Sequence, residues 1–189
     1  MILSRRQELL REFVIKAHGD QVRKYSDEPY IVHLDAVASM VVPFIPKYPL
    51  IWEVAICHDL FEDTLAAQII NEELIRIGYI DEEMFIIVSG IYDLTDVFTK
   101  ETCPHLNREG RKRNESNRLG RTCPSSQTTK YADLIHNTES IVENDPKFAV
   151  TYLQEKAMYL QKMRNGEWDL YEKAVWTLHE SKLKLGLWR

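Results

Sequence analysis

Apolar residues recur at helical spacing along almost the whole chain, and no stretch alternates apolar and polar residues for long enough to predict a strand. Helix boundaries are marked as well: residues 4–7 form a capping box, Gly78 stands at an expected C-terminal cap, and Asp145-Pro146 is a helix-start signal. A chain of 189 residues is long enough for one well-buried domain and short for two. We therefore expect an all-α fold, with a single domain over residues 1–189 built from about eight helices.

The segment IWEVAICHDLFED is predicted as one helix, and it carries an unusual group of ionisable residues. If the helix is continuous, His58, Asp59, Glu62 and Asp63 fall within an arc of about 140°, because successive residues rotate by about 100°. Such groups are costly to bury unless they are paired or bind metal. The alternative is a solvated face of polar pairs.

Cysteine usage and the lack of long apolar runs predict a cytoplasmic protein with free thiols. Cys57, Cys103 and Cys123 include no CxxC pair, and their odd number argues against a disulfide framework. Pairing of Cys103 with Cys123, or a zinc site that includes His105, is a minor alternative. No apolar run reaches the roughly 18 residues that span a bilayer, and the N-terminus lacks a secretory pattern. We expect no membrane partner, and the oligomeric state is left open.

The net charge of −5 is distributed unevenly. Residues 100–130 contain eight Lys or Arg against three Glu, so this segment is basic within an otherwise acidic chain. We expect a partly helical basic insertion at about residues 100–124, which is either a site for a phosphorylated ligand or a solvated excursion. Nucleic-acid binding is not expected, because the acidic remainder of the chain would repel a polyanion.

Two imidazoles and two carboxylates from separate segments could together form a metal site. His33 lies in PYIVH, His58 and Asp59 open HDLFED, and Asp133 lies in KYADLIHN. Together they offer the mixed nitrogen and oxygen donors that suit a divalent ion. Each segment alone has a structural explanation, since His33 could be a core histidine and Asp133 could pair with Lys130 along a helix. Their order and number favour the metal site.

The motifs PYIVH, HDLFEDT and KYADLIHN, in this order, resemble those of HD-domain metal-dependent phosphohydrolases. The similarity is strongest to the hydrolase domain of the RelA/SpoT family and to stand-alone small alarmone hydrolases. It covers about residues 8–165, and KAHGDQVRKYSDEPYIVHLDAVASMV matches the opening of that domain nearly position by position. The resemblance implies an all-helical HD-domain fold.

The resemblance also implies which residues bind metal and which act on water. The metal ligands of the family, normally around Mn²⁺, match His33, His58, Asp59 and Asp133. The pair that positions and activates water matches Glu62 and Asp63. The same donor set would also suit Fe²⁺, Co²⁺ or Zn²⁺.

The residues that match the family's substrate contacts are basic or polar. They are Arg23, Lys24, Asn137, Ser140 and Arg108. The resemblance therefore implies hydrolysis of a small nucleotide, with removal of the 3′-pyrophosphate from ppGpp or a related alarmone as the leading hypothesis and a place in the stringent response. The alternatives are an HD-domain nucleotidase or cyclic-nucleotide phosphodiesterase, and a non-catalytic nucleotide-binding or interaction domain. The chain departs from compact family members by a longer stretch between Asp59 and Asp133.

Overall fold

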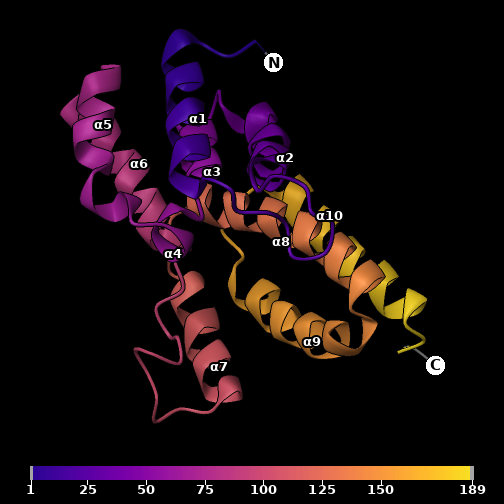
Figure 1. The fold of residues 1–189 in the computed structure, drawn as a ribbon. Coiled ribbons are helices and arrows are strands. Elements are labelled where there is room, and N and C mark those ends of the chain that lie inside the picture. Colours follow the sequence, from indigo (N-terminus) through magenta and orange to yellow (C-terminus); the bar gives the residue numbers. More distant parts are fainter. Residues whose placement is uncertain (1, 188–189) are drawn as a thin grey trace. The chain divides into compact units, whose positions relative to one another are not determined.

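The computed structural model describes residues 2–187, and it is helical almost throughout (Figure 1). These residues form ten α-helices, two short 3₁₀ helices and no β-strand, apart from an isolated antiparallel bridge between Val22 and Pro29. The all-α prediction is confirmed. None of the helices described is both long and apolar enough to cross a membrane. The α-helices are α1 (Arg5–His18), α2 (Ile31–Val41), α3 (Ile51–Ile56), α4 (Leu60–Asp63), α5 (Ile70–Ile77), α6 (Asp81–Leu94), α7 (Arg108–Leu119), α8 (Pro124–Asn144), α9 (Pro146–Lys162) and α10 (Trp168–Lys184), and the 3₁₀ helices are η1 (Val42–Phe44) and η2 (Ala66–Gln68).

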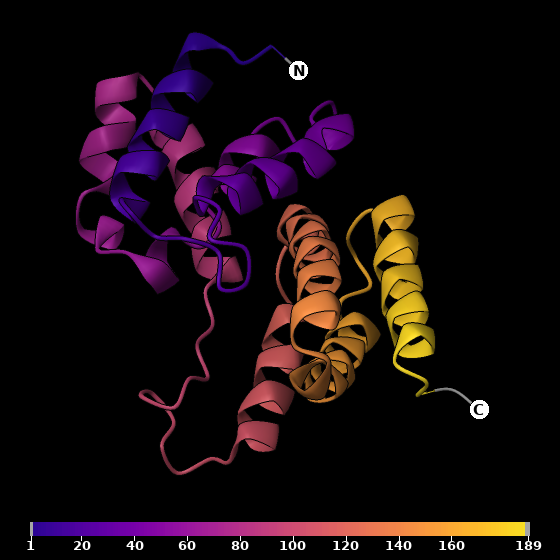
Figure 2. The ribbon, with the colours of Figure 1, turned by 45° about the vertical axis from the view of Figure 1, so that its right-hand side comes forward.

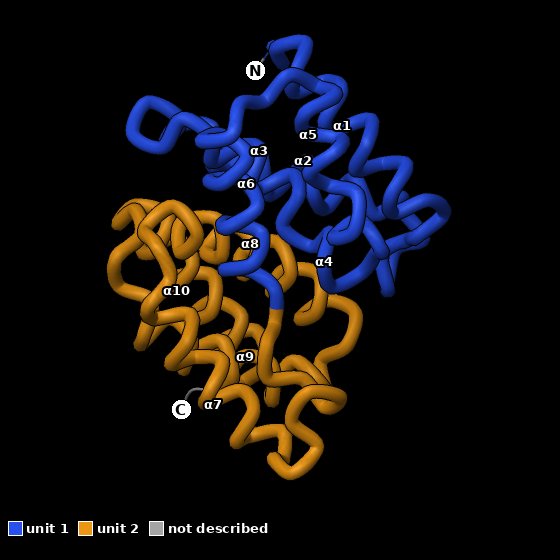
Figure 3. The backbone as a smooth tube through the Cα atoms, turned by 90° about the vertical axis from the view of Figure 1, so that its left-hand side faces the viewer, with its two compact units in different colours: residues 1–95 blue, residues 96–189 orange. Residues whose placement is uncertain are grey.

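The chain divides into two compact units, Met1–Thr95 and Asp96–Arg189 (Figure 3). The positions of these units relative to one another are not determined (Figure 1), so each is described by itself. The single domain expected over residues 1–189 stays a prediction.

The short helix α3 is the buried element of the first unit, where it contacts α1, α2 and α6. All six of its residues are buried. They include Glu53, whose Oε1 accepts hydrogen bonds from Gln7 Nε2 at 3.1 Å and from the Tyr79 hydroxyl at 3.4 Å. Helix α6 approaches α3 closely at Gly90, which has no side chain. A Cβ at this position would lie 2.7 Å from both methyl groups of Val54 on α3. This packing fixes the end of α3, and therefore the start of the turn that follows.

The helix predicted over IWEVAICHDLFED is not continuous. Helix α3 ends at Ile56 and α4 begins at Leu60, so a turn separates them. In this turn the backbone N–H of Leu60 donates to the carbonyl of Cys57 at 3.0 Å, a spacing of three residues that interrupts the α-helical pattern. The expected common helix face is therefore wrong. The turn presents His58 and Asp59 instead.

In the second unit, α8 packs against α9 and α10 (Figure 2). The buried side chain of Gln127 on α8 is satisfied locally, because its Nε2 donates to the carbonyls of Leu119 at 3.3 Å and Thr122 at 3.1 Å. The hydroxyl of Tyr131 donates to the carbonyl of Met163 at 2.9 Å, which ties α8 to the end of α9. These bonds hold α8 in a fixed rotation against its neighbours.

The basic segment is part of the packed second unit. Its helix α7 contacts α9, and the Ser116 hydroxyl donates to the carbonyl of Met158 at 2.8 Å. Glu115 has no exposed surface, and its Oε2 accepts the backbone N–H groups of Val97 and Phe98 at 3.1 Å each. The expectation of partly helical structure is confirmed, whereas a solvated excursion does not describe this helix.

Candidate metal centre

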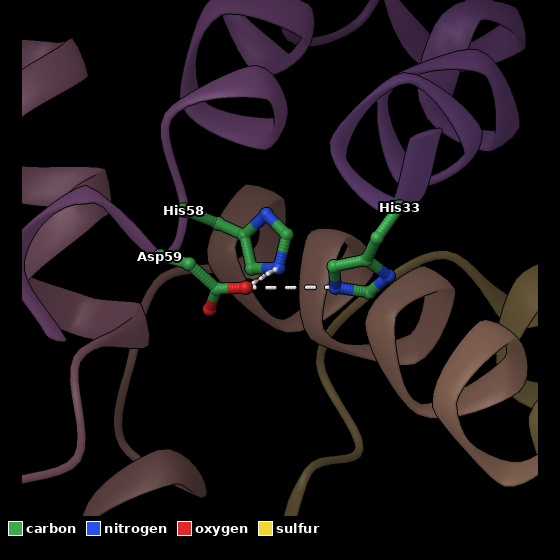
Figure 4. A group of neighbouring side chains, drawn as sticks. All are labelled: His33, His58 and Asp59. Carbon is green, nitrogen blue, oxygen red and sulfur yellow. Dashed lines mark ion pairs between the residues drawn. The ribbon is translucent and has the colours of Figure 1, made fainter. Parts of the chain in front are cut away.

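Three of the four predicted metal ligands come together in the first unit (Figure 4). His33 lies on α2, and His58 and Asp59 lie in the turn between α3 and α4. One ligand atom from each residue lies within 4.8 Å of the others. Both histidines are buried, and the side chain of Asp59 is 15% exposed. The cluster thus combines two fixed imidazoles with a carboxylate that solvent can reach.

Both imidazoles face the same carboxylate oxygen, Oδ2 of Asp59 (Figure 4). His58 Nε2 lies 3.1 Å from this oxygen and His33 Nε2 lies 3.5 Å from it. The Tyr30 hydroxyl donates to it at 2.7 Å. Asp59 stands at the N-cap position of α4 but makes no side-chain capping bond, so its carboxylate is turned toward the histidines instead.

The hydrogen bonding of His58 fits a metal ligand. Its Nδ1 lies 2.8 Å from the carbonyl of Ala55, and because a carbonyl only accepts, Nδ1 carries the proton. In a neutral ring Nε2 then presents a lone pair toward Asp59, whose carboxylate also only accepts. Two acceptors 3.1 Å apart require a positive centre beside them, either a second proton on the ring or a cation. Metal-binding histidines are typically oriented through their other nitrogen in this way. The cluster therefore fits a divalent metal site.

The carboxylate of Asp59 stays ionised in this setting. Burial opposes its ionisation, but the charges of His58 and His33 and their hydrogen bonds outweigh burial, so the pKa of Asp59 lies well below its usual range. An ionised carboxylate is the form that binds metal.

A second layer of side chains holds the site, and the sequence analysis assigned it no role. The Oε1 atom of Gln21 lies 2.8 Å from His18 Nδ1, and its Nε2 donates to Asp63 Oδ2 at 2.9 Å. The His18 ring stacks on Tyr30 with centroids 5.0 Å apart. These residues stand in the segment KAHGDQVRKYSDEPYIVH, whose resemblance to the opening of the family's hydrolase domain was the only sequence signal for them.

The predicted catalytic pair lies at the end of the short helix α4. Glu62 and Asp63 are both exposed, so either can reach solvent or a bound substrate. Asp63 is oriented by Gln21, as described above. Their roles stay predictions.

Asp133 belongs to the second unit, so its part in the metal site stays a prediction. Its Oδ1 accepts a hydrogen bond from Asn137 Nδ2 at 2.5 Å, and Lys130 Nζ lies 2.8 Å from its Oδ2. The helical ion pair considered as the structural explanation is therefore present. Asp133 is 4% exposed, and the two contacts fix the direction of its carboxylate.

The remaining predicted contacts lie in different parts of the chain. Arg23 and Lys24 occupy the loop between α1 and α2, where Arg23 N donates to the carbonyl of Glu28 at 2.8 Å. Ser140 lies on α8, one turn beyond the helix segment that carries Asn137. The role of these residues in substrate binding stays a prediction.

Arg108 is held by the second unit itself. Its Nε donates to Oε1 of Glu155 at 2.5 Å and its second nitrogen donates to Oε2 at 3.0 Å, which is a bidentate pair. A substrate phosphate would have to compete with this carboxylate, so the contact predicted for Arg108 stays a prediction.

Comparison with known proteins addresses the fold. No family model matches the chain, and no curated protein matches it. A solved structure described as a metazoan ortholog of SpoT that hydrolyzes ppGpp and plays a role in starvation responses superposes with a TM-score of 0.71. This chain has the fold of that ppGpp hydrolase. The match covers 100% of this chain and 99% of the other at 19% identity. The predicted resemblance to the RelA/SpoT-family hydrolase domain is therefore confirmed at the level of the fold.

Proposed function

We propose that this chain is a metal-dependent phosphohydrolase that removes the 3′-pyrophosphate from ppGpp or a related alarmone. The observation that carries the proposal is the convergence of His33 Nε2 and His58 Nε2 on one oxygen of Asp59. The fold shared with a ppGpp hydrolase supports the choice of substrate class. The substrate would be a small nucleotide.

The residues of the first unit would have separate roles in metal binding, proton transfer and phosphate binding. A divalent ion bound by the cluster, Mn²⁺ in the family that the chain resembles, would polarise a phosphoryl oxygen and lower the pKa of a bound water. Glu62 would accept the proton of the attacking water, and Asp63, held by Gln21, would orient that water. Arg23 and Lys24 would neutralise the charge of the nucleotide phosphates.

A substrate panel tests the proposal. Purified protein loaded with Mn²⁺ is incubated with ppGpp, pppGpp, ppApp, nucleoside monophosphates and cyclic nucleotides, and products are separated by anion-exchange chromatography. We expect release of pyrophosphate from ppGpp and no turnover of cyclic nucleotides. Metal-loaded protein that hydrolyses none of these compounds would be a binding domain, and the proposal would be wrong.

Metal analysis tests the ligand set independently of turnover. His58→Ala removes an observed member of the cluster, and Asp133→Ala removes the predicted fourth ligand. We expect strongly reduced occupancy in both variants. Normal occupancy in Asp133→Ala alone would restrict the site to the three residues of the first unit.

A further inference from the structure

Two consecutive hydrogen bonds link the end of α1 to one member of the predicted catalytic pair. His18 Nδ1 lies 2.8 Å from Gln21 Oε1, and Gln21 Nε2 lies 2.9 Å from Asp63 Oδ2. All three residues belong to the first unit, where they lie at the end of α1, in the loop after it and at the end of α4. His18 is buried, whereas Asp63 is exposed. The hydrogen bonds therefore connect a buried imidazole to a carboxylate that a substrate can reach.

The direction of both hydrogen bonds follows from the carboxylate at one end. A carboxylate only accepts, so the amide of Gln21 has its nitrogen toward Asp63 and its oxygen toward His18. The amide oxygen also only accepts, so Nδ1 of His18 carries the proton. A reversed amide would place two oxygens against each other at Asp63. The imidazole donor and the carboxylate thus favour the same orientation of the amide.

The backbone after α1 keeps Gln21 within reach of His18. Gly19 follows His18 with a φ of 54°, a conformation that residues with a side chain rarely adopt. The backbone N–H of Gly19 donates to the carbonyl of Ile15 at 2.9 Å, and that of Gln21 donates to the carbonyl of His18 at 3.1 Å. The carbonyl of Gln21 accepts the N–H of Tyr30 at 2.9 Å. The backbone of Gln21 is therefore fixed, and the contact from His18 fixes the amide at the end of its side chain.

The other ring nitrogen of His18 argues against a role in packing alone. Nε2 is buried, and it has no hydrogen-bond partner among the described residues. With the proton on Nδ1, a neutral ring presents a lone pair at Nε2, and an unsatisfied buried acceptor is costly. An apolar ring could stack on Tyr30 without this cost. What the imidazole adds to an apolar ring is the Nδ1 donor to Gln21.

We propose that His18 is a positioning residue that holds the carboxylate of Asp63 through the amide of Gln21. The effect on turnover rests on the proposed function, in which Asp63 orients the attacking water, whereas the two hydrogen bonds do not depend on it. A carboxylate held in one direction keeps that water in line for attack. The opposing explanation is that the His18 ring only supports Tyr30, whose hydroxyl donates to Asp59.

Two substitutions of His18 separate its donor from its ring. His18→Phe keeps a ring that can stack on Tyr30 and removes the donor, whereas His18→Asn removes the ring and keeps an N–H donor at the position of Nδ1. We expect kcat for ppGpp to fall about 10-fold to 100-fold in His18→Phe, the usual effect of losing an orienting partner, and to recover in His18→Asn. KM and Mn²⁺ occupancy should stay near wild type in both variants, because only the orientation of the water changes. Wild-type kcat in His18→Phe would overturn the proposal, and impaired His18→Asn beside it would assign His18 to the ring stack.

A double substitution tests whether His18 acts through Gln21. Gln21→Met keeps the length of the side chain and removes both hydrogen bonds, and Gln68→Met, at an exposed glutamine of the same unit, is the matched control. Adding His18→Phe to Gln21→Met should lower kcat no further, whereas losses that multiply would overturn the proposal. The Tm of His18→Phe should equal or exceed that of wild type, because the unsatisfied Nε2 is removed. A fall in Tm that parallels the loss of kcat would overturn the proposal in favour of a structural role.

The tautomer of His18 can be measured without substrate or metal. Nitrogen-15 NMR of the full chain, at a pH where the ring is neutral, should show the proton on Nδ1. A proton on Nε2 would overturn the proposal whether or not any nucleotide is hydrolysed. The Nδ1–H tautomer in a chain that hydrolyses no nucleotide would support the two hydrogen bonds and remove the proposed function. Hydrolysis of ppGpp by a chain with the proton on Nε2 would remove only the role of His18.

Discussion

Oδ2 of Asp59 is approached by His33 Nε2, His58 Nε2 and the Tyr30 hydroxyl, and the hydroxyl is the nearest of the three. Tyr30→Phe removes this donor and keeps the ring that stacks on His18. We expect metal affinity or kcat/KM to fall about 10-fold to 100-fold, which is the usual effect of losing a partner that orients a ligand. Metal titration and steady-state kinetics measure both quantities. Tyr92→Phe, an exposed tyrosine of the same unit, is the control and should match wild type.

A substitution at Glu62 tests proton transfer separately from metal binding. Glu62→Gln keeps the size of the side chain and removes its basicity, so metal should stay bound while kcat falls by about 10² or more. Metal analysis and kinetics on the same preparation provide the comparison. Turnover equal to wild type at saturating substrate would exclude Glu62 as the base.

Motif order predicted that His33, His58 and Asp59 belong to one site, and the structure brings these three together. The contact from Tyr30 could not be predicted, because it depends on how the loop before α2 folds back. That loop is closed by a hydrogen bond from Tyr30 N to the carbonyl of Gln21 at 2.9 Å, a pairing with no periodic pattern in the sequence. Residue identity indicated the chemistry, and tertiary structure supplied the orientation.

At the scale of elements, local chemistry at helix ends was predictable. The capping box of Ser4 and Gln7 is present, Gly78 ends α5 in the left-handed region with φ 97°, and Asp145 caps α9. The interruption after α3 was not predictable, because the apolar run continues up to Cys57 and periodicity does not register a single three-residue turn.

The close contact between α3 and α6 leads to a prediction about stability. Gly90→Ala would place a Cβ 2.7 Å from the methyl groups of Val54, in a fully packed contact. We expect unfolding to become easier by about 1–3 kcal/mol, even though alanine is the better helix former, because overpacking outweighs propensity. Ser89→Ala, at the neighbouring and partly exposed position, is the control. Denaturant unfolding of both variants tests the prediction, and a Gly90→Ala protein more stable than wild type would show that the helices separate freely.

At the scale of the whole molecule, Lys156 imposes a pH dependence on stability. Burial lowers its pKa from 10.5 to about 8, so the unfolded chain binds an additional proton between these values. The free energy of unfolding should therefore rise as pH increases from about 8 toward 10. Tyr159 acts in the opposite sense only above pH 10, because burial raises the pKa of its hydroxyl.

Unfolding of wild type and Lys156→Met across this pH range measures the effect. The difference in unfolding free energy between the two should change between pH 8 and pH 10, with wild type gaining stability relative to the variant. Parallel pH profiles would show that Lys156 keeps an ordinary pKa.

The division into two compact units was not visible in the sequence. Helical periodicity identifies which face of a helix is buried, but it does not say which helices share a core. The basic segment is an example. Its charge suggested a surface excursion, but Glu115 and Ser116 on its helix α7 are buried against other segments of the second unit.

The residue before His58 is a buried cysteine whose labelling can report how often the turn opens. Cys57 immediately precedes His58 and has no exposed surface, and burial raises the pKa of its thiol, whereas Cys123 is exposed. A thiol reagent should therefore modify Cys123 at once and Cys57 only when the turn opens. When labelling is faster than reclosing, the slow labelling rate equals the opening rate of the ligand turn. Mn²⁺ should slow it by a factor of one plus the ratio of the free Mn²⁺ concentration to its Kd.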